Sequence, residues 1–202
     1  MQSENVYIGD DKFEKFLSHY NCPTELFEVK LKFAGAICSP NVNLRPTDVI
    51  SSLFEENKQP RLETKDEANL FFKFFMGLWD EMFKQVSYNE LKLPKAIKGS
   101  KEDLIILCNK RSRQLECGFV EGFWGGLDKL DIPDFVAELI NSLSDLAEAY
   151  YMLANKMKKM NNLDDNIFKV IINMDKKAEE IFSFIIEHQV LPHIDELKKQ
   201  VN

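Results

Sequence analysis

Apolar residues recur every three or four positions along almost the whole chain, which is the spacing of an amphipathic helix. The pattern begins at 11–20, resumes after Pro23 over 27–38, and returns in a short stretch at 47–54. The first stretch places Phe13, Phe16 and Leu17 on one face. No stretch shows the strict alternation of a half-buried strand. The sequence therefore predicts an all-α fold.

The longest apolar stripe occupies residues 68–86. Thr64 followed three residues later by Glu67 has the spacing of a capping box and predicts that a helix begins there. Leu70 and Phe74 widen the stripe, so we expect a central helix contacted on two sides. The following connection, 87–100, is expected to lie across the surface. Ser100 and Asp103 predict the next helix start.

Residues 136–160 carry apolar side chains in three columns along one predicted helix, where a free coiled coil needs only two. The columns are Val136, Leu143, Tyr150 and Met157; Leu139, Leu146, Leu153 and Met160; and Ile140, Ala147 and Ala154. A returning stripe over 167–185 follows the predicted turn 161–166, which indicates an antiparallel helical hairpin. Pro192 should end or kink the second helix and leave a short amphipathic tail with Ile194 and Leu197.

In total we expect a bundle of about seven helices. Residues 1–130 would form an amino-terminal helical bundle, and residues 131–202 a hairpin packed on it within one continuous domain.

The stretch "CGFVEGFWGGLDKL", residues 117–130, holds half of the eight glycines and one of the two tryptophans. Gly118, Gly122 and Gly126 are four residues apart, so on an α-helix they drift only about 40° per step and form a furrow. Three glycines in a helix interior cost roughly 3 kcal/mol against alanine. Burial of the adjacent Phe119, Phe123 and Trp124 could offset that cost, because one buried Phe contributes roughly 1.5–3 kcal/mol.

Phosphate-binding motifs do not fit this stretch. No Lys-Ser or Lys-Thr follows Gly122 at P-loop spacing, and neither a G-x-G-x-x-G sequence nor a preceding strand is present. The glycines therefore predict a furrow for packing or for contact with another element.

Three stretches resemble the YecA/YgfB-like bacterial proteins: "FAGAICSPNVNLRPTDVISSLFEE", "DEANLFFKFFMGLWDEM" and "GFVEGF". The resemblance covers about 12–129. It identifies Gly35 with the glycine of the first family block, and Gly118, Phe119 and Gly122 with those of the second. It implies an all-α protein without assigned enzymatic activity, with some members regulating genes through protein contacts. The chain lacks the family's His-Gly pair in "VKLKF" and the SecA-like carboxy-terminal zinc segment.

A net charge of -7 and a pI near 5.1 disfavour a dedicated nucleic-acid binder. The best basic patch is "NKRSRQ", with Lys110, Arg111 and Arg113. We expect Lys110 and Arg113 to be solvated and Arg111 to pair with a carboxylate. Nucleic-acid binding through these three residues is the least favoured alternative.

The chain has four widely spaced cysteines and no signal-peptide pattern, which predicts a cytoplasmic protein with reduced thiols. It has no apolar run of about 20 residues, so no membrane span is predicted. His188 and His193 are five residues apart, off the spacing that places two ligands on one helix face. No metal or cofactor is predicted.

Two acidic pairs define an enzymatic alternative. Glu25 with Glu28, and Asp145 with Glu148, could hold Mg²⁺ in an all-α hydrolase if the four carboxylates converged. The preferred prediction is a non-catalytic protein-interaction or regulatory module with an unidentified protein partner. If the columns of 136–160 are only partly covered, two chains could also pair through them as a symmetric homodimer.

Overall fold

The computed structural model describes residues 6–54, 58–161 and 166–192, which contain helices and no strand. This confirms the all-α prediction. The helical elements are α1 (Asp10–His19), α2 (Leu26–Cys38), α3 (Pro46–Ser52), α4 (Lys65–Ser87), α5 (Lys101–Arg113), the π-helical segment η1 (Gln114–Val120), α6 (Glu121–Trp124), α7 (Asp134–Lys159) and α8 (Ile167–Gln189). Since α5, η1 and α6 follow one another without a break, they make one helical rod, and the described residues then hold seven helices.

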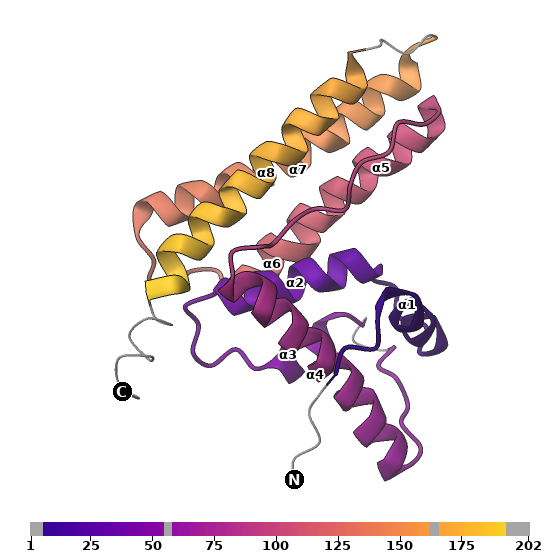
Figure 1. Cartoon of the computed structure of the whole chain (residues 1–202), viewed down its shortest axis with the longest axis vertical. Coiled ribbons are helices and arrows are strands. Elements are labelled where there is room, and N and C mark those ends of the chain that lie inside the picture. The colour runs from indigo at the N-terminus through magenta and orange to yellow at the C-terminus, as the bar shows by residue number, and fades with distance from the viewer. Residues whose placement is uncertain (1–5, 55–57, 162–165, 193–202) are drawn as a thin grey trace.

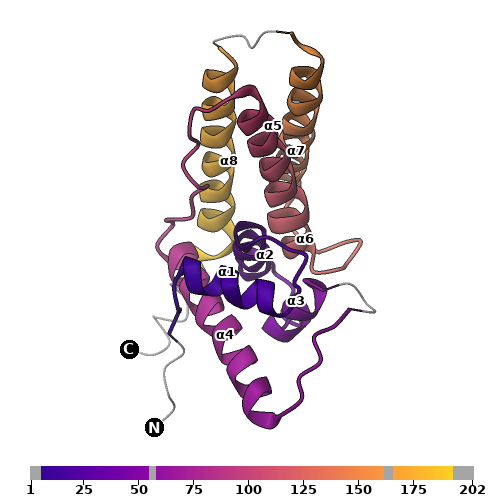
Figure 2. The same ribbon diagram turned by 90° about the vertical axis from the view of Figure 1, so that its right-hand side faces the viewer.

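The molecule has two ends joined at α2 (Figures 1 and 2). At one end α5, α7 and α8 lie side by side, with α7 packed on both α5 and α8. At the other end α4 packs on α2, and α1 and α3 complete this part. Because α5 precedes residue 130 and yet packs on α7, the contacts join the two parts expected from the sequence into one body.

Aromatic rings fill the end built from α1, α2 and α4. The ring of Phe16 has centroid distances of 5.1–5.6 Å to its neighbours Phe13, Tyr20, Phe71, Phe74 and Phe75. On another face of α4, Gly77 lies against the backbone of Val6: a Cβ at Gly77 would be 2.8 Å from the Val6 carbonyl oxygen. Helix α4 is thus contacted on two sides. Leu70 does not take part, since it is 49% exposed.

Mostly aliphatic side chains fill the end built from α5, α7 and α8. Within the columns of α7, the side chains of Val136, Leu143, Tyr150 and Met157 are fully buried by the chain's own helices. Ile140, Ala147 and Ala154 are buried too. In the remaining column Leu146 is buried, whereas Leu139, Leu153 and Met160 are only partly buried. Pairing of two chains through these columns therefore stays a prediction.

The predicted helix starts hold, with one difference. Ser100 and Asp103 form a complete capping box, because each side chain accepts a hydrogen bond from the other's backbone N–H. At α4, the Glu67 backbone N–H donates to Thr64 Oγ1 at 3.1 Å, but the Glu67 carboxylate accepts from the Glu63 N–H and not from Thr64. Helix α8 ends at Gln189, before Pro192. Much of the predicted turn 161–166 and the tail with Ile194 and Leu197 lie outside the described residues.

The connection 88–100 is more deeply placed than predicted. It has no helix or strand, yet Leu91, Leu93 and Ala96 are buried. The Leu93 N–H donates to Glu179 Oε1 on α8 at 3.1 Å. The connection therefore belongs to the packed bundle, because its apolar side chains are buried while its backbone bonds to polar side chains.

Candidate functional site

The glycines of the rod lie where α2 crosses it. A Cβ added to Gly122 would be 2.2 Å from the Lys32 carbonyl oxygen, and one added to Gly35 would be 2.1 Å from the Phe119 carbonyl oxygen. At Gly118 the nearest atoms would be 3.1 Å and 3.2 Å away. Only glycine allows two helix backbones to approach this closely. Gly35 and the two rod glycines thus form one reciprocal contact, the glycine crossing.

The crossing includes an element that the sequence pattern did not reveal. Residues 114–120 are π-helical, with Gly118 inside this segment and Gly122 in the α-helical turn after it. The π-helix is rare and tends to occur at functional sites. The positions of these glycines around the rod therefore differ from those predicted for a regular α-helix.

Gly126 does not belong to the crossing, which corrects the predicted furrow. Helix α6 ends at Trp124, and Gly125 caps it with φ 57°. Gly126 follows with φ 79°, and a Cβ added to it would have nothing within 4 Å. These left-handed conformations favour glycine and turn the chain away from the rod. Phe119 and Phe123 are fully buried, whereas Trp124 is only half-buried.

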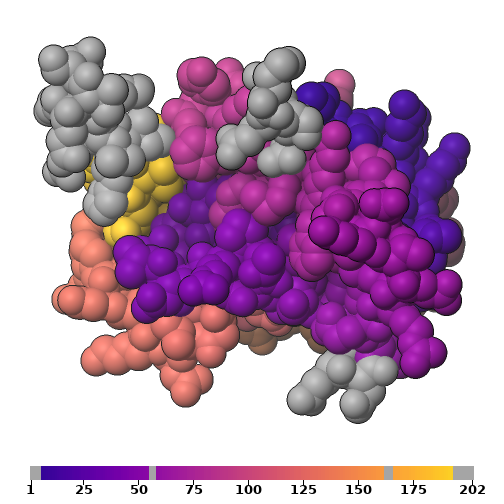
Figure 3. All heavy atoms as spheres, turned by 90° about the horizontal axis from the view of Figure 1, so that it is seen from below, coloured from indigo at the N-terminus to yellow at the C-terminus, as the bar shows by residue number. Residues whose placement is uncertain are grey.

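A pocket of about 530 Å³ opens at this turn. We call it the glycine-turn pocket; its lining includes Leu44, Val49, Val120, Trp124 and Leu127 as apolar residues, Gly122, Gly125 and Gly126, and Ser144 from α7. Seen from below, the segment between α2 and α3 (purple) lies beside the loop after α6 (salmon) (Figure 3). The pocket thus combines a rigid helix crossing with two surface loops.

Charge on the lining of the glycine-turn pocket is mainly negative. Asp48, Glu116, Glu121 and Asp128 line it, against the single cation Lys32. Lys32 Nζ lies 3.1 Å from Glu121 Oε2, so this ammonium is already paired. The carboxy-terminal end of the rod also lies here and adds partial negative charge from its last carbonyls. A cationic group would be favoured at this position.

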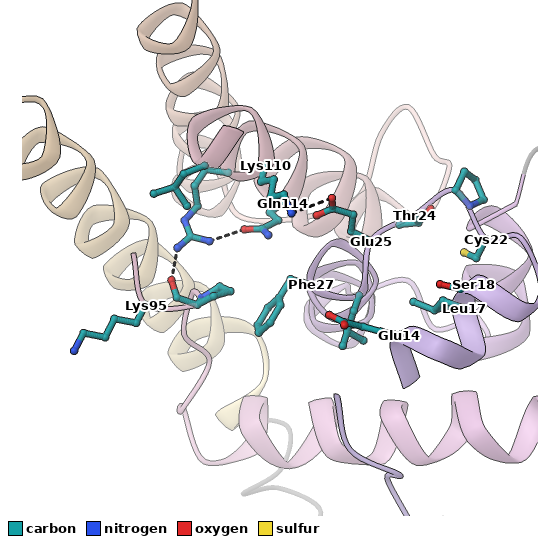
Figure 4. A pocket seen from close by; sticks show the side chains of 15 residues that line it. Glu14, Leu17, Ser18, Cys22, Thr24, Glu25, Phe27, Lys95, Lys110 and Gln114 are labelled. Atoms are coloured by element: carbon teal, nitrogen blue, oxygen red, sulfur yellow. Dashed lines mark hydrogen bonds and ion pairs between the residues drawn. The ribbon is translucent and has the colours of Figure 1, made fainter. Parts of the chain in front are cut away.

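A second pocket, of about 480 Å³, lies between α1, the start of α2, the connection 88–100 and α5 (Figure 4). Its labelled side chains include Glu14, Phe27 and Lys95. Lys110 lies 3.2 Å from Glu25, while Arg113 lies 2.9 Å from Glu28. Arg111 is 1% exposed and is also paired with a carboxylate. Each of the three basic side chains considered for nucleic-acid binding therefore has a carboxylate partner.

Arg111 is the centre of a buried polar network. Its Nε donates to Asp175 Oδ1 at 2.8 Å, its Nη1 to Gln114 Oε1 at 2.7 Å, and its Nη2 to the Pro94 carbonyl. The Tyr150 hydroxyl donates to the same Asp175 oxygen at 2.7 Å. Burial, with the charge of Asp175, raises the pKa of Tyr150. The network joins α5, η1, α7, α8 and the connection.

The predicted partner carboxylate of Arg111 thus exists, but the sequence did not identify it. Asp175 interrupts the apolar stripe of 167–185, between the buried Ile171 and Ala178. An acidic residue at such a position was the one available signal that it pairs inside the bundle.

The four carboxylates of the hydrolase alternative are not brought together. Glu28 is buried, and its burial raises its pKa although Arg113 opposes the shift. Asp145 and Glu148 are exposed on α7. Among the described residues no group of three His, Cys, Asp or Glu side chains is placed to hold a metal ion. His188 packs edge-on against Phe135, and His193 lies outside the described residues.

No protein-family model, no curated protein and no solved structure matches the chain. The resemblance to YecA/YgfB-like proteins therefore stays a prediction. None of the helices that the structure describes is long and apolar enough to cross a membrane.

Proposed function

We propose that this protein is a non-catalytic interaction module that docks a partner protein at the glycine-turn pocket. The observation that carries the proposal is the half-buried Trp124, held at the end of the glycine crossing in a pocket of about 530 Å³. Aromatic residues are enriched at protein interfaces and often supply much of the binding energy. The pocket lies within the usual size range for binding sites, about 300–1,000 Å³.

The crossing supports this function by fixing one wall of the pocket. Gly122 contacts the backbone of α2 and also lines the pocket, so the wall cannot shift without opening the helix contact. A wall that is already in place lowers the entropic cost of binding. The resemblance to proteins that act through protein contacts agrees with such a role.

The test is capture of native complexes from the source cell with the wild-type chain and two tryptophan variants. Ser144→Trp places a large side chain in the pocket, whereas Ala149→Trp places the same side chain on an exposed position of the same helix outside it. We expect the wild-type chain and Ala149→Trp each to capture a partner protein in an amount near-equal to their own. Ser144→Trp should capture no partner. Full retention by Ser144→Trp, or no partner in comparable amount with wild type, would contradict the proposal.

A further inference from the structure

We infer that the segment docked in the glycine-turn pocket is a basic one, with an apolar side chain that enters the pocket and flanking Lys or Arg residues that pair with its rim. This inference rests on the proposed function, because it names the chemistry of the partner at the same pocket.

Three carboxylates line the glycine-turn pocket without a cationic partner among the described residues: Asp48, Glu116 and Asp128. We call these three carboxylates the rim. Glu121 pairs with Lys32, but no ion pair joins Asp48, Glu116 or Asp128 to another described residue. Asp48 accepts a hydrogen bond from the Arg45 backbone N–H at 3.0 Å, which satisfies one oxygen without neutralising its charge. Three negative charges around one opening favour a partner with two or more positive charges.

The neighbouring cations do not remove this excess. Arg45 and Lys129 adjoin the pocket in sequence, but both side chains are exposed and neither lines it. The rod of 101–124 ends at the pocket, and its terminal carbonyls add to the negative potential. With Lys32 paired to Glu121, the carboxylates of Asp48, Glu116 and Asp128 and the end of the rod favour a positively charged partner.

The apolar part of the pocket lining sets the second requirement, an apolar side chain on the partner. Val49 and Val120 line the pocket and are buried, and Leu127, which also lines it, is 46% exposed. Trp124 offers a ring that can contact an apolar side chain or the face of an arginine. A pocket of this volume accommodates one or two side chains of an extended segment, so short peptides are adequate probes.

The experiment measures fluorescence anisotropy of three fluorescein-labelled peptides with the full chain at low and at high salt. The peptides are Lys-Lys-Leu-Phe-Lys-Lys, its Gln counterpart and its Glu counterpart. We expect the basic peptide to bind about tenfold more tightly than the neutral one at low salt, the combined effect of several rim ion pairs. The acidic peptide should not bind, and salt should reduce the difference because it screens exposed charges.

Two triple variants separate the rim from the net charge of the protein. Asp48→Asn with Glu116→Gln and Asp128→Asn neutralises the rim and should reduce the affinity for the basic peptide to that for the neutral one. Asp11→Asn with Glu102→Gln and Glu180→Gln changes the net charge equally at exposed positions away from the pocket and should leave the affinity within about twofold. Equal weakening by both variants would mean unspecific attraction and would overturn the inference.

The remaining outcomes distinguish this inference from the proposed function. If the neutral peptide binds as tightly as the basic one, and Ser144→Trp abolishes both, the pocket docks partners but the charge argument is wrong. If none of the peptides binds, the basic segment is excluded. If, in addition, capture of native complexes is insensitive to Ser144→Trp, the proposed function fails as well.

Discussion

The two ends of the molecule achieve specific packing by different means. Around α1 and α4, rings such as Phe16 and Phe75 meet at edges and tilted angles, and their shape and preferred geometry define how the helices fit. Around α5, α7 and α8 the side chains are mostly aliphatic, and the buried Arg111 with Asp175 supplies directional contacts. A fully satisfied buried network requires every partner in place. In the aliphatic end, one buried polar network thus fixes how the helices fit together, as the aromatic rings do at the other end.

The largest expected effect comes from breaking that network. Arg111→Met leaves the Asp175 carboxylate buried with Tyr150 as its one remaining donor among the described residues. Removal of one partner of a buried ion pair typically costs about 3–5 kcal/mol. We expect a loss of this size in the free energy of unfolding measured with urea. The double variant Arg111→Met, Asp175→Leu should recover most of the loss. A loss below about 1 kcal/mol in the single variant would show that the network contributes little to stability.

The matching change at the aromatic end is Phe16→Leu. It keeps an apolar side chain but removes the ring from five ring contacts, each worth about 0.5–1.5 kcal/mol beyond buried area when measured singly. Because such contacts are not additive, we expect a loss of about 2 kcal/mol in urea unfolding. Phe184→Leu, at a 52% exposed position of α8, should change stability by less than about 0.5 kcal/mol. Equal effects of the two substitutions would contradict the role given to the rings.

Two buried thiols test whether the two ends open together. Cys38 lies on α2 and Cys108 on α5, and burial raises the pKa of both, that of Cys108 to about 12. We expect Cys22 and Cys117, which are half-buried, to react with Ellman's reagent in the native protein, and Cys38 and Cys108 to react only upon unfolding. Equal reaction rates of Cys38 and Cys108, measured by mass spectrometry, would indicate that the two ends unfold as one cooperative unit. Reaction of Cys108 well before Cys38 would show that the ends unfold separately.

The smallest effect concerns Asp10, at the edge of the aromatic end. Burial alone would raise its pKa, but hydrogen bonds from Lys30 and Tyr7 outweigh burial and hold the pKa below its usual value. Because the folded-state pKa is the lower one, the stabilisation is present at neutral pH and is lost as the pH falls through that value. Asp10→Asn should lower stability at pH 6 by less than about 1 kcal/mol, since Asp10 is 45% exposed in this pair.

Urea unfolding of Asp10→Asn and wild type at pH 6 and pH 3 checks this prediction. The difference between the two proteins should shrink at the lower pH. A difference that stays constant or grows would contradict the sign of the pKa shift.

The features predicted from sequence are those set by neighbouring residues. The 3.6-residue period located the helices, and Ser100 with Asp103 located a cap, because both depend on contacts within one or two turns. The pairing of Arg111 with Asp175 joins residues 64 positions apart, so its partner could not be chosen from the sequence. The glycine-turn pocket depends on how the segment before α3 meets the turn at Gly126, which local pattern does not determine.

The sign of one stability change tests whether the bare side of the rod exists for close packing against α2. In an uncontacted helix, Gly122→Ala should stabilise the protein by up to about 1 kcal/mol, because alanine is the better helix former. The new Cβ would instead lie 2.2 Å from the Lys32 carbonyl oxygen, so we expect urea unfolding to show a net loss of about 1–3 kcal/mol. Gly35→Ala should show a similar loss and Gly118→Ala a smaller one. Variants at Gly35 and Gly122 that are more stable than the wild type would contradict the account.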